Sequence, residues 1–143
     1  MRIPSICVAA LALAAAAAPT LRAQAPAAPT PAIGILLPTN GSTVTSPVTV
    51  RFRLVNYGVA PAGTQLDRTG HFHLLIDNEA GAPGTIIPAD SMHLHYGKGD
   101  IEVTVSVPLG RHTLRAVLGD GTHKVISTDL VSEPVTVRVV ARR

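Results

Sequence analysis

The sequence predicts an all-β fold: an immunoglobulin-like antiparallel β-sandwich of about seven strands that follows a signal peptide. Three observations support this fold class. Apolar and polar residues alternate in several short segments, turn-forming residues separate those segments, and no stretch after the N-terminal segment shows the helical spacing of apolar positions. Sandwiches of this type need about 100 residues, which the rest of the chain supplies.

The N-terminal segment, residues 1–23, is predicted to be a secretory signal peptide. Arg2 provides the positive start, residues 8–18 form an apolar centre, and small residues around Ala23 suit cleavage. The alternative is an uncleaved membrane anchor, but the apolar run is shorter than the ~20 residues that span a bilayer. We therefore expect a periplasmic or secreted bacterial protein with no membrane span in the mature chain.

The segment that follows, residues 24–32, is rich in proline and alanine and has no periodicity. Such a composition is typical of an extended linker. The sandwich domain is then expected to occupy residues 33–141.

Charge and cysteine content exclude several functions. Without Arg2 and Arg22, the twelve basic residues become ten, against nine acidic residues. This balance leaves no basic surface large enough for nucleic acid, so we expect no nucleic-acid partner. The one cysteine, Cys7, lies in the predicted signal peptide, which excludes disulfides and thiolate metal sites from the mature chain.

Period-two alternation identifies the strands. It is clearest in residues 48–54, 101–107 and 135–139, where one side of each strand would face the core and the other side solvent. Turn-forming sequences at 39–42, 61–63, 79–84, 108–110 and 119–121 separate the predicted strands.

Two H-x-H pairs carry the functional signal. They lie in "HFHLLID" (71–77) and "MHLHY" (92–96), and on a strand both pairs project from the face opposite the apolar residues. If the two segments are neighbours, four imidazoles converge, and neutral imidazole is the commonest metal ligand. A further histidine follows a Gly-Asp-Gly turn and could reach the same place, or remain solvated. The candidate metal ligands are therefore His71, His73, His93, His95 and His123.

Other interpretations remain open. The histidines could form a polar cluster with Asp67, Asp77 or Asp90 that binds nothing. His112 shares the strand face of the core residues Leu114 and Ala116, which favours a structural role like that of the corner tyrosine in sandwich domains.

The run "GHFHLLID", then "MHLHYGKGDIEV", then "GRHTLRAVLGDGTH" resembles an uncharacterised family of exported bacterial domains, catalogued as a domain of unknown function. The resemblance covers roughly residues 33–140, and all six histidines of the chain fall on histidines of the family motifs. The sequence departs from the pattern at Phe72, where the family usually has a middle histidine. It departs again after His123, where a further histidine and a proline pair are common in the family.

The chemistry that follows is metal binding. All-imidazole ligation favours copper, zinc or nickel over magnesium or calcium. Copper is the first candidate and zinc the second, because an exported protein without thiols suits copper handling. One alternative is a structural or interaction module of the cell envelope with no metal, in which the imidazoles would point apart. Another is a copper-dependent redox enzyme of superoxide-dismutase type, by analogy only. No catalytic residue is assigned, whether the protein is an enzyme stays open, and the protein partner is unknown.

Overall fold

The computed structural model describes residues 29–142 of the chain. The predicted signal peptide and residues 24–28 of the predicted linker lie outside this range. Nine strands and one 3₁₀ turn (η1, Thr128–Leu130) form the described part. The strands are β1 (Ala32–Leu37), β2 (Ser42–Thr45), β3 (Val48–Val55), β4 (Gly58–Val59), β5 (Thr69–Ile76), β6 (His93–Tyr96), β7 (Glu102–Val105), β8 (Gly110–Gly119) and β9 (Val135–Val140).

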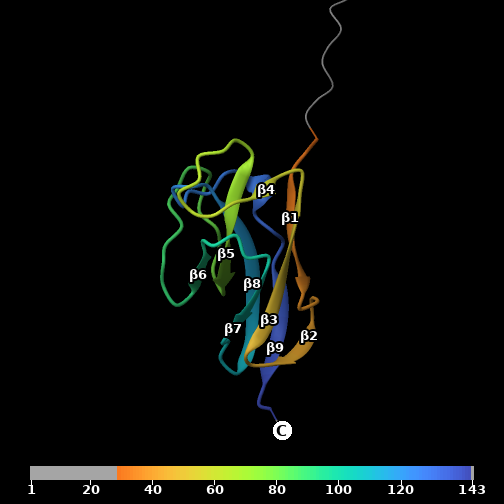
Figure 1. The fold of residues 1–143 in the computed structure, drawn as a ribbon. Helices are drawn as coiled ribbons and strands as arrows, with labels where there is room; N and C mark the ends of the chain where they lie inside the picture. The colour runs from red at the N-terminus through yellow and green to blue at the C-terminus, as the bar shows by residue number, and fades with distance from the viewer. Residues whose placement is uncertain (1–28, 143) are drawn as a thin grey trace, which may run out of the picture.

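The strands form two sheets, which confirms the predicted β-sandwich (Figure 1). One sheet has three strands in the order β1-β3-β7. The other has the order β2-β9-β8-β5-β4, with β6 pairing β5 beside β4. Strand β5 therefore lies between β8 on one side and β4 and β6 on the other, and this position makes it the centre of the site described below.

The structure departs from the prediction in two short strands. β2 and β4, of four and two residues, bring the described total to nine rather than about seven. Both pair in parallel, β2 with β9 and β4 with β5, within an otherwise antiparallel fold. Neither β2 nor β4 is joined to its partner by a hairpin. Parallel strands cannot be joined by a tight turn and need a longer connection than a hairpin provides. Segments this short carry too little alternation to be recognised in the sequence.

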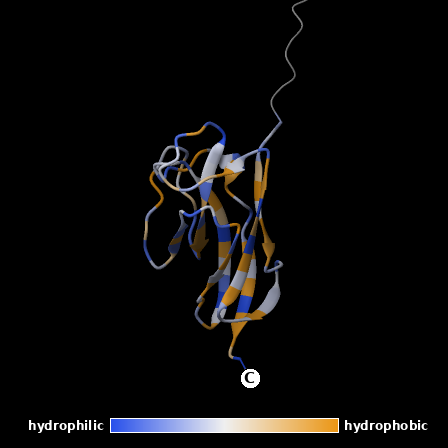
Figure 2. Ribbon diagram, viewed as in Figure 1, coloured by the Kyte–Doolittle hydropathy of each residue, from blue (hydrophilic) through white to orange (hydrophobic). Residues whose placement is uncertain are grey.

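The main core lies between the two sheets. Phe52 of β3 stacks on Phe72 of β5, with ring centroids 4.3 Å apart. Burial alternates along β3 as predicted, with Val48, Val50 and Phe52 buried and the residues between them exposed. Figure 2 shows the corresponding alternation of hydrophilic and hydrophobic bands along the strands. The period-two pattern thus places these strands correctly.

Strand β5 is different, because both of its faces are buried. The loops that follow β5 and β8 cover its outer face. Ile87 and Val125 of these loops pack there with Leu75 of β5 and Val117 of β8 and form a second small core. Backbone hydrogen bonds join these loops: the N–H of Ile87 donates to the carbonyl of His123 at 2.8 Å, and that of Val125 to Thr85 at 2.9 Å. The histidines lie on the face opposite the main core, as the strand alternation predicts, but the alternation does not show that loops fold back over that face.

Candidate metal centre

Four histidines gather on the outer face of β5. His71 and His73 come from β5, His95 from β6, and His123 from the loop after β8. The strand register brings these rings together. His73 lies directly opposite His95 on β6, and His71 lies opposite Gly119 of β8, where the loop that carries His123 begins. One ring nitrogen from each histidine lies within 4.8 Å of the other three. Three of the four H-x-H histidines and His123 therefore form one cluster.

The loop from Asp120 to Lys124 holds His123 in place. Oδ1 of Asp120 accepts hydrogen bonds from the N–H groups of Thr122 (2.8 Å) and Lys124 (3.0 Å), which closes a tight turn. His123 has a φ of 65°, a left-handed conformation that is uncommon for residues other than glycine. Residues held in this way are concentrated at functional sites. The turn directs Nδ1 of His123 to 3.2 Å from Nε2 of His71.

Two glycines make room for the rings. A Cβ atom on Gly119 would lie 2.9 Å from Nε2 of His73, closer than real Cβ contacts. A Cβ atom on Gly97 would overlap the ring of His95 in the same way. The close packing of imidazoles against backbone therefore depends on the absence of side chains at positions 97 and 119.

The contacts among the ring nitrogens exceed what neutral imidazoles can satisfy with hydrogen bonds. Nε2 of His71 lies 3.0 Å from Nε2 of His73 and 3.2 Å from Nδ1 of His123. A neutral ring nitrogen carries either one hydrogen or one lone pair, so Nε2 of His71 cannot form a full hydrogen bond to both neighbours. Within residues 29–142, Nδ1 of His71 and of His73 has no hydrogen-bond partner, so no protein acceptor fixes the tautomer of either ring.

Burial keeps these imidazoles neutral. His71 and His73 are 0% and 1% exposed. Desolvation, followed by repulsion from His95 and His123, lowers the pKa of His71 to about 4, although Asp120 acts weakly in the opposite direction. Desolvation and the neighbouring histidines lower the pKa of His73 to about 3. Partial desolvation, followed by repulsion from His123, also lowers the pKa of His95, although the side chain of His95 is exposed. At neutral pH these three rings are therefore uncharged and keep a lone pair for a cation.

The nitrogen positions are compatible with one ion. Zinc–nitrogen bonds of 2.0–2.1 Å in a tetrahedron place the ligand atoms about 3.3–3.4 Å apart. The contacts of His71 with His73 and His123, at 3.0 and 3.2 Å, are already close to this separation, and the other pairs lie within 4.8 Å. Small rotations of the rings would bring all four nitrogens to one cation. A module without metal was expected to hold its imidazoles apart, whereas the four imidazoles of this cluster lie close together.

His93 does not join this cluster. Its Nδ1 lies 2.9 Å from Oδ1 of Asp90, and its backbone N–H donates to the same oxygen at 3.0 Å. The H-x-H spacing placed it correctly on the face that carries His95, but its ring turns back to a residue three positions earlier. The sequence contained the signal for this, since an aspartate that begins a turn commonly accepts hydrogen bonds from the following N–H groups.

His112 occupies a structural position away from the cluster. Its Nδ1 lies 2.6 Å from Oδ2 of Asp77, and Oδ1 of Asp77 accepts a hydrogen bond from the N–H of Thr113 at 2.7 Å. The pair ties the start of β8 to the end of β5. This arrangement agrees with the structural role inferred from its strand face.

The fold and this site define a class of protein: an all-β sandwich domain with a half-enclosed cluster of four histidines on one sheet. The chain belongs to the family described as "Domain of unknown function (DUF4399)", whose model matches residues 50–140. This confirms the resemblance noted in the sequence. Comparison with curated proteins and with solved structures gives no significant match. Between residues 29 and 142, no helix is long and apolar enough to cross a bilayer.

Proposed function

We propose that the protein binds one transition-metal ion through His71, His73, His95 and His123. The observation that carries this proposal is the position of Nε2 of His71, which contacts two other ring nitrogens and cannot satisfy both with a proton. A cation accepts lone pairs from every ring at once and removes this conflict.

Copper is the preferred ion, with zinc second. The four candidate ligands are all imidazoles, and such sites favour copper, nickel and zinc over the hard cations that carboxylates bind. The N-terminal sequence supports a periplasmic or secreted location, where a domain without thiols is suited to copper handling.

The proposed role is binding or carriage of the ion rather than catalysis. Two of the four rings are buried, His123 is half-buried and His95 is exposed. An ion would therefore enter and leave on the side of His95 and His123, while β5 supplies the fixed ligands. This opening is consistent with transfer of the ion to and from a partner.

A titration tests the proposal. Copper(II) or zinc is added to the chelator-treated protein, and the bound metal is counted by native mass spectrometry while the melting temperature is followed. We expect one ion per chain and a higher melting temperature, since a ligand that binds only the folded state at about a thousand times its Kd adds about 4 kcal/mol to the unfolding free energy. His112→Ala is the control: it removes a histidine outside the cluster, so the variant should still bind one ion per chain. No retained ion from either metal would refute the proposal.

A further inference from the structure

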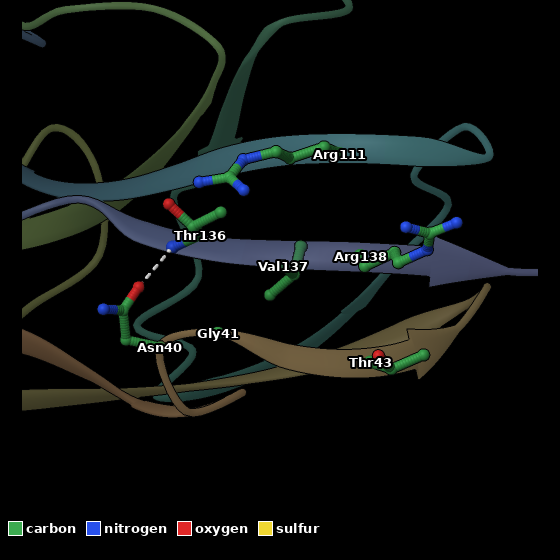
Figure 3. Close-up of a pocket in the computed structure, with 7 residues that line it drawn as sticks. All are labelled: Asn40, Gly41, Thr43, Arg111, Thr136, Val137 and Arg138. Carbon is green, nitrogen blue, oxygen red and sulfur yellow. Dashed lines mark hydrogen bonds between the residues drawn. The ribbon is translucent and has the colours of Figure 1, made fainter.

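A pocket lies at the end of the six-stranded sheet that is remote from the histidine cluster (Figure 3). It has a volume of about 310 Å³, at the lower end of the range for small-molecule sites. Its lining residues come from β8, β9, β2 and the turn before β2, and none of them carries a carboxylate. They are Asn40, Gly41, Thr43, Arg111, Thr136, Val137 and Arg138.

Two arginines of this pocket are direct cross-strand neighbours. Arg111 of β8 pairs with Arg138 of β9 in the antiparallel register, and both side chains are exposed. Like charges placed opposite each other destabilise a sheet. Neither guanidinium has a hydrogen-bond or ion-pair partner among the described residues, whereas Arg51 and Arg115 pair with glutamates. No ion pair among the described residues offsets this repulsion, and an anionic ligand would do so.

The other polar groups of the pocket are hydrogen-bond donors as well. The hydroxyls of Thr43 and Thr136 lie on the strands next to the arginines. Oδ1 of Asn40 accepts a hydrogen bond from the N–H of Thr136 at 2.8 Å, and the side-chain amide nitrogen of Asn40 has no acceptor within residues 29–142. Figure 3 shows the guanidinium of Arg111 extending over Thr136, while that of Arg138 turns toward the end of β9. The two guanidinium groups thus point in different directions along the sheet.

From this arrangement we infer that the Arg111–Arg138 pocket binds a phosphate group. Guanidinium groups form paired hydrogen bonds with phosphate oxygens, and two of them match the roughly −1.5 to −2 charge of a phosphate monoester near neutral pH. A phosphate monoester offers three terminal oxygens and nearly two charges, whereas a carboxylate offers two oxygens and one charge, so phosphate matches the two arginines and the threonine hydroxyls better. The volume also exceeds what a lone phosphate fills, so the ligand is a phosphate-bearing molecule, either a soluble ester or a lipid headgroup.

The site is separate from the histidine cluster. Arg111 and Gly119 are eight positions apart on β8, which corresponds to about 26 Å at ~3.3 Å per residue. Both sites lie on the outer face of the same sheet, but at opposite ends of the sandwich, with the phosphate pocket toward the C-terminal end of β9. Phosphate binding therefore does not depend on the proposed metal.

The first test uses inorganic phosphate as the probe at constant ionic strength, with binding followed by NMR of the backbone and arginine side-chain N–H groups. We expect saturable shifts at Arg111 and Arg138. Arg111→Gln and Arg138→Gln should each weaken binding by about tenfold or more, because each removes a charged hydrogen-bond donor. The matched control is Arg53→Gln, which removes the same charge from an exposed position on β3 in the other sheet. The melting temperatures of the three variants verify that each is folded.

A second arm distinguishes the two sources of phosphate. Wild type and the same variants are sedimented with vesicles of phosphatidylcholine alone or mixed with phosphatidylglycerol. Binding that requires phosphatidylglycerol and is lost in Arg111→Gln and Arg138→Gln supports a lipid headgroup. Saturable binding of inorganic phosphate without vesicle binding supports a soluble ester. If the protein binds neither inorganic phosphate nor vesicles, the inference is overturned. It is also overturned if Arg53→Gln weakens binding as much as Arg111→Gln and Arg138→Gln do.

Discussion

Gly119 of β8 leaves the space that the imidazole of His73 occupies: a Cβ atom at position 119 would lie 2.9 Å from Nε2 of His73 and 3.3 Å from Cδ1 of Ile87. The pair connects the second core, which contains Ile87, to the histidine cluster. A substitution at this glycine therefore tests whether the exact placement of His73 matters for metal binding.

Gly119→Ala should displace the ring of His73 and weaken metal binding by about tenfold or more, with about 1–3 kcal/mol of overpacking cost to stability. The control is Gly34→Ala in β1, where a Cβ atom would meet nothing within 4 Å. Isothermal titration with copper and zinc measures the effect. Equal affinities of the two variants would show that the space beside His73 is unimportant.

The two histidines of β6 should behave differently. His95→Ala should weaken metal binding strongly, because it removes a ligand atom of the cluster. His93→Ala should change the affinity only slightly, because the ring of His93 contacts Asp90 instead. Competition with a coloured chelator measures both affinities. A comparable loss in the two variants would place His93 among the ligands and contradict the arrangement described.

The metal-free protein should lose stability in weak acid. The pKa of His71 is lowered to about 4 and that of His73 to about 3, mainly by burial, so protons bind the unfolded chain first as the pH falls below about 6.5. Above that pH the two residues contribute no pH dependence. At about pH 5 the unfolding free energy should be about 2 kcal/mol lower for each residue than at about pH 8.

Urea unfolding in the presence of a chelator measures this slope. In the control variant, asparagine replaces both histidines, and the slope between about pH 6.5 and pH 4 should flatten. Asp77 does not interfere in this range. Although partial burial acts the other way, hydrogen bonds from His112 and Thr113 lower the pKa of Asp77 below its ordinary 3.8. An unchanged slope in the control variant would assign the acid sensitivity to other groups.

His112→Ala should lower stability and leave metal binding intact. The substitution removes the imidazole that pairs with Asp77 at 2.6 Å, and loss of one partner of a charged hydrogen bond costs about 1–3 kcal/mol. The unfolding free energy and the metal affinity are measured on the same sample. Loss of metal binding without loss of stability would mean that His112 belongs to the metal site.

The sequence predicts the strands of this fold well, because a core between two sheets imposes period-two alternation. The same rule places Phe72 in the core and His71 and His73 on the opposite face. It cannot show that the opposite face is covered, because that depends on loops whose course is set by individual hydrogen bonds. The turn closed by Asp120 and the left-handed backbone of His123 are examples.

The sequence also could not show which histidines of the H-x-H pairs belong to the cluster. Strand spacing treats His93 and His95 as equivalent, but the carboxylate of Asp90 turns His93 away from the other rings. The roles of Gly97 and Gly119 were also missed, although the two glycines belong to the stretches "HYG" (95–97) and "LGDG" (118–121), which lie next to candidate ligands or a predicted turn. Their importance is visible only when the rings that approach them are in place.

The coordination shell of the loaded protein tests the central claim most directly. X-ray absorption spectroscopy of the copper- or zinc-bound protein reports the number, type and distance of the ligand atoms. Our account predicts four imidazole nitrogens at about 2.0–2.1 Å for zinc, with the outer-shell scattering typical of histidine rings, and the loss of one imidazole in His95→Ala. A shell made mainly of oxygen ligands, or one unchanged in His95→Ala, would contradict it.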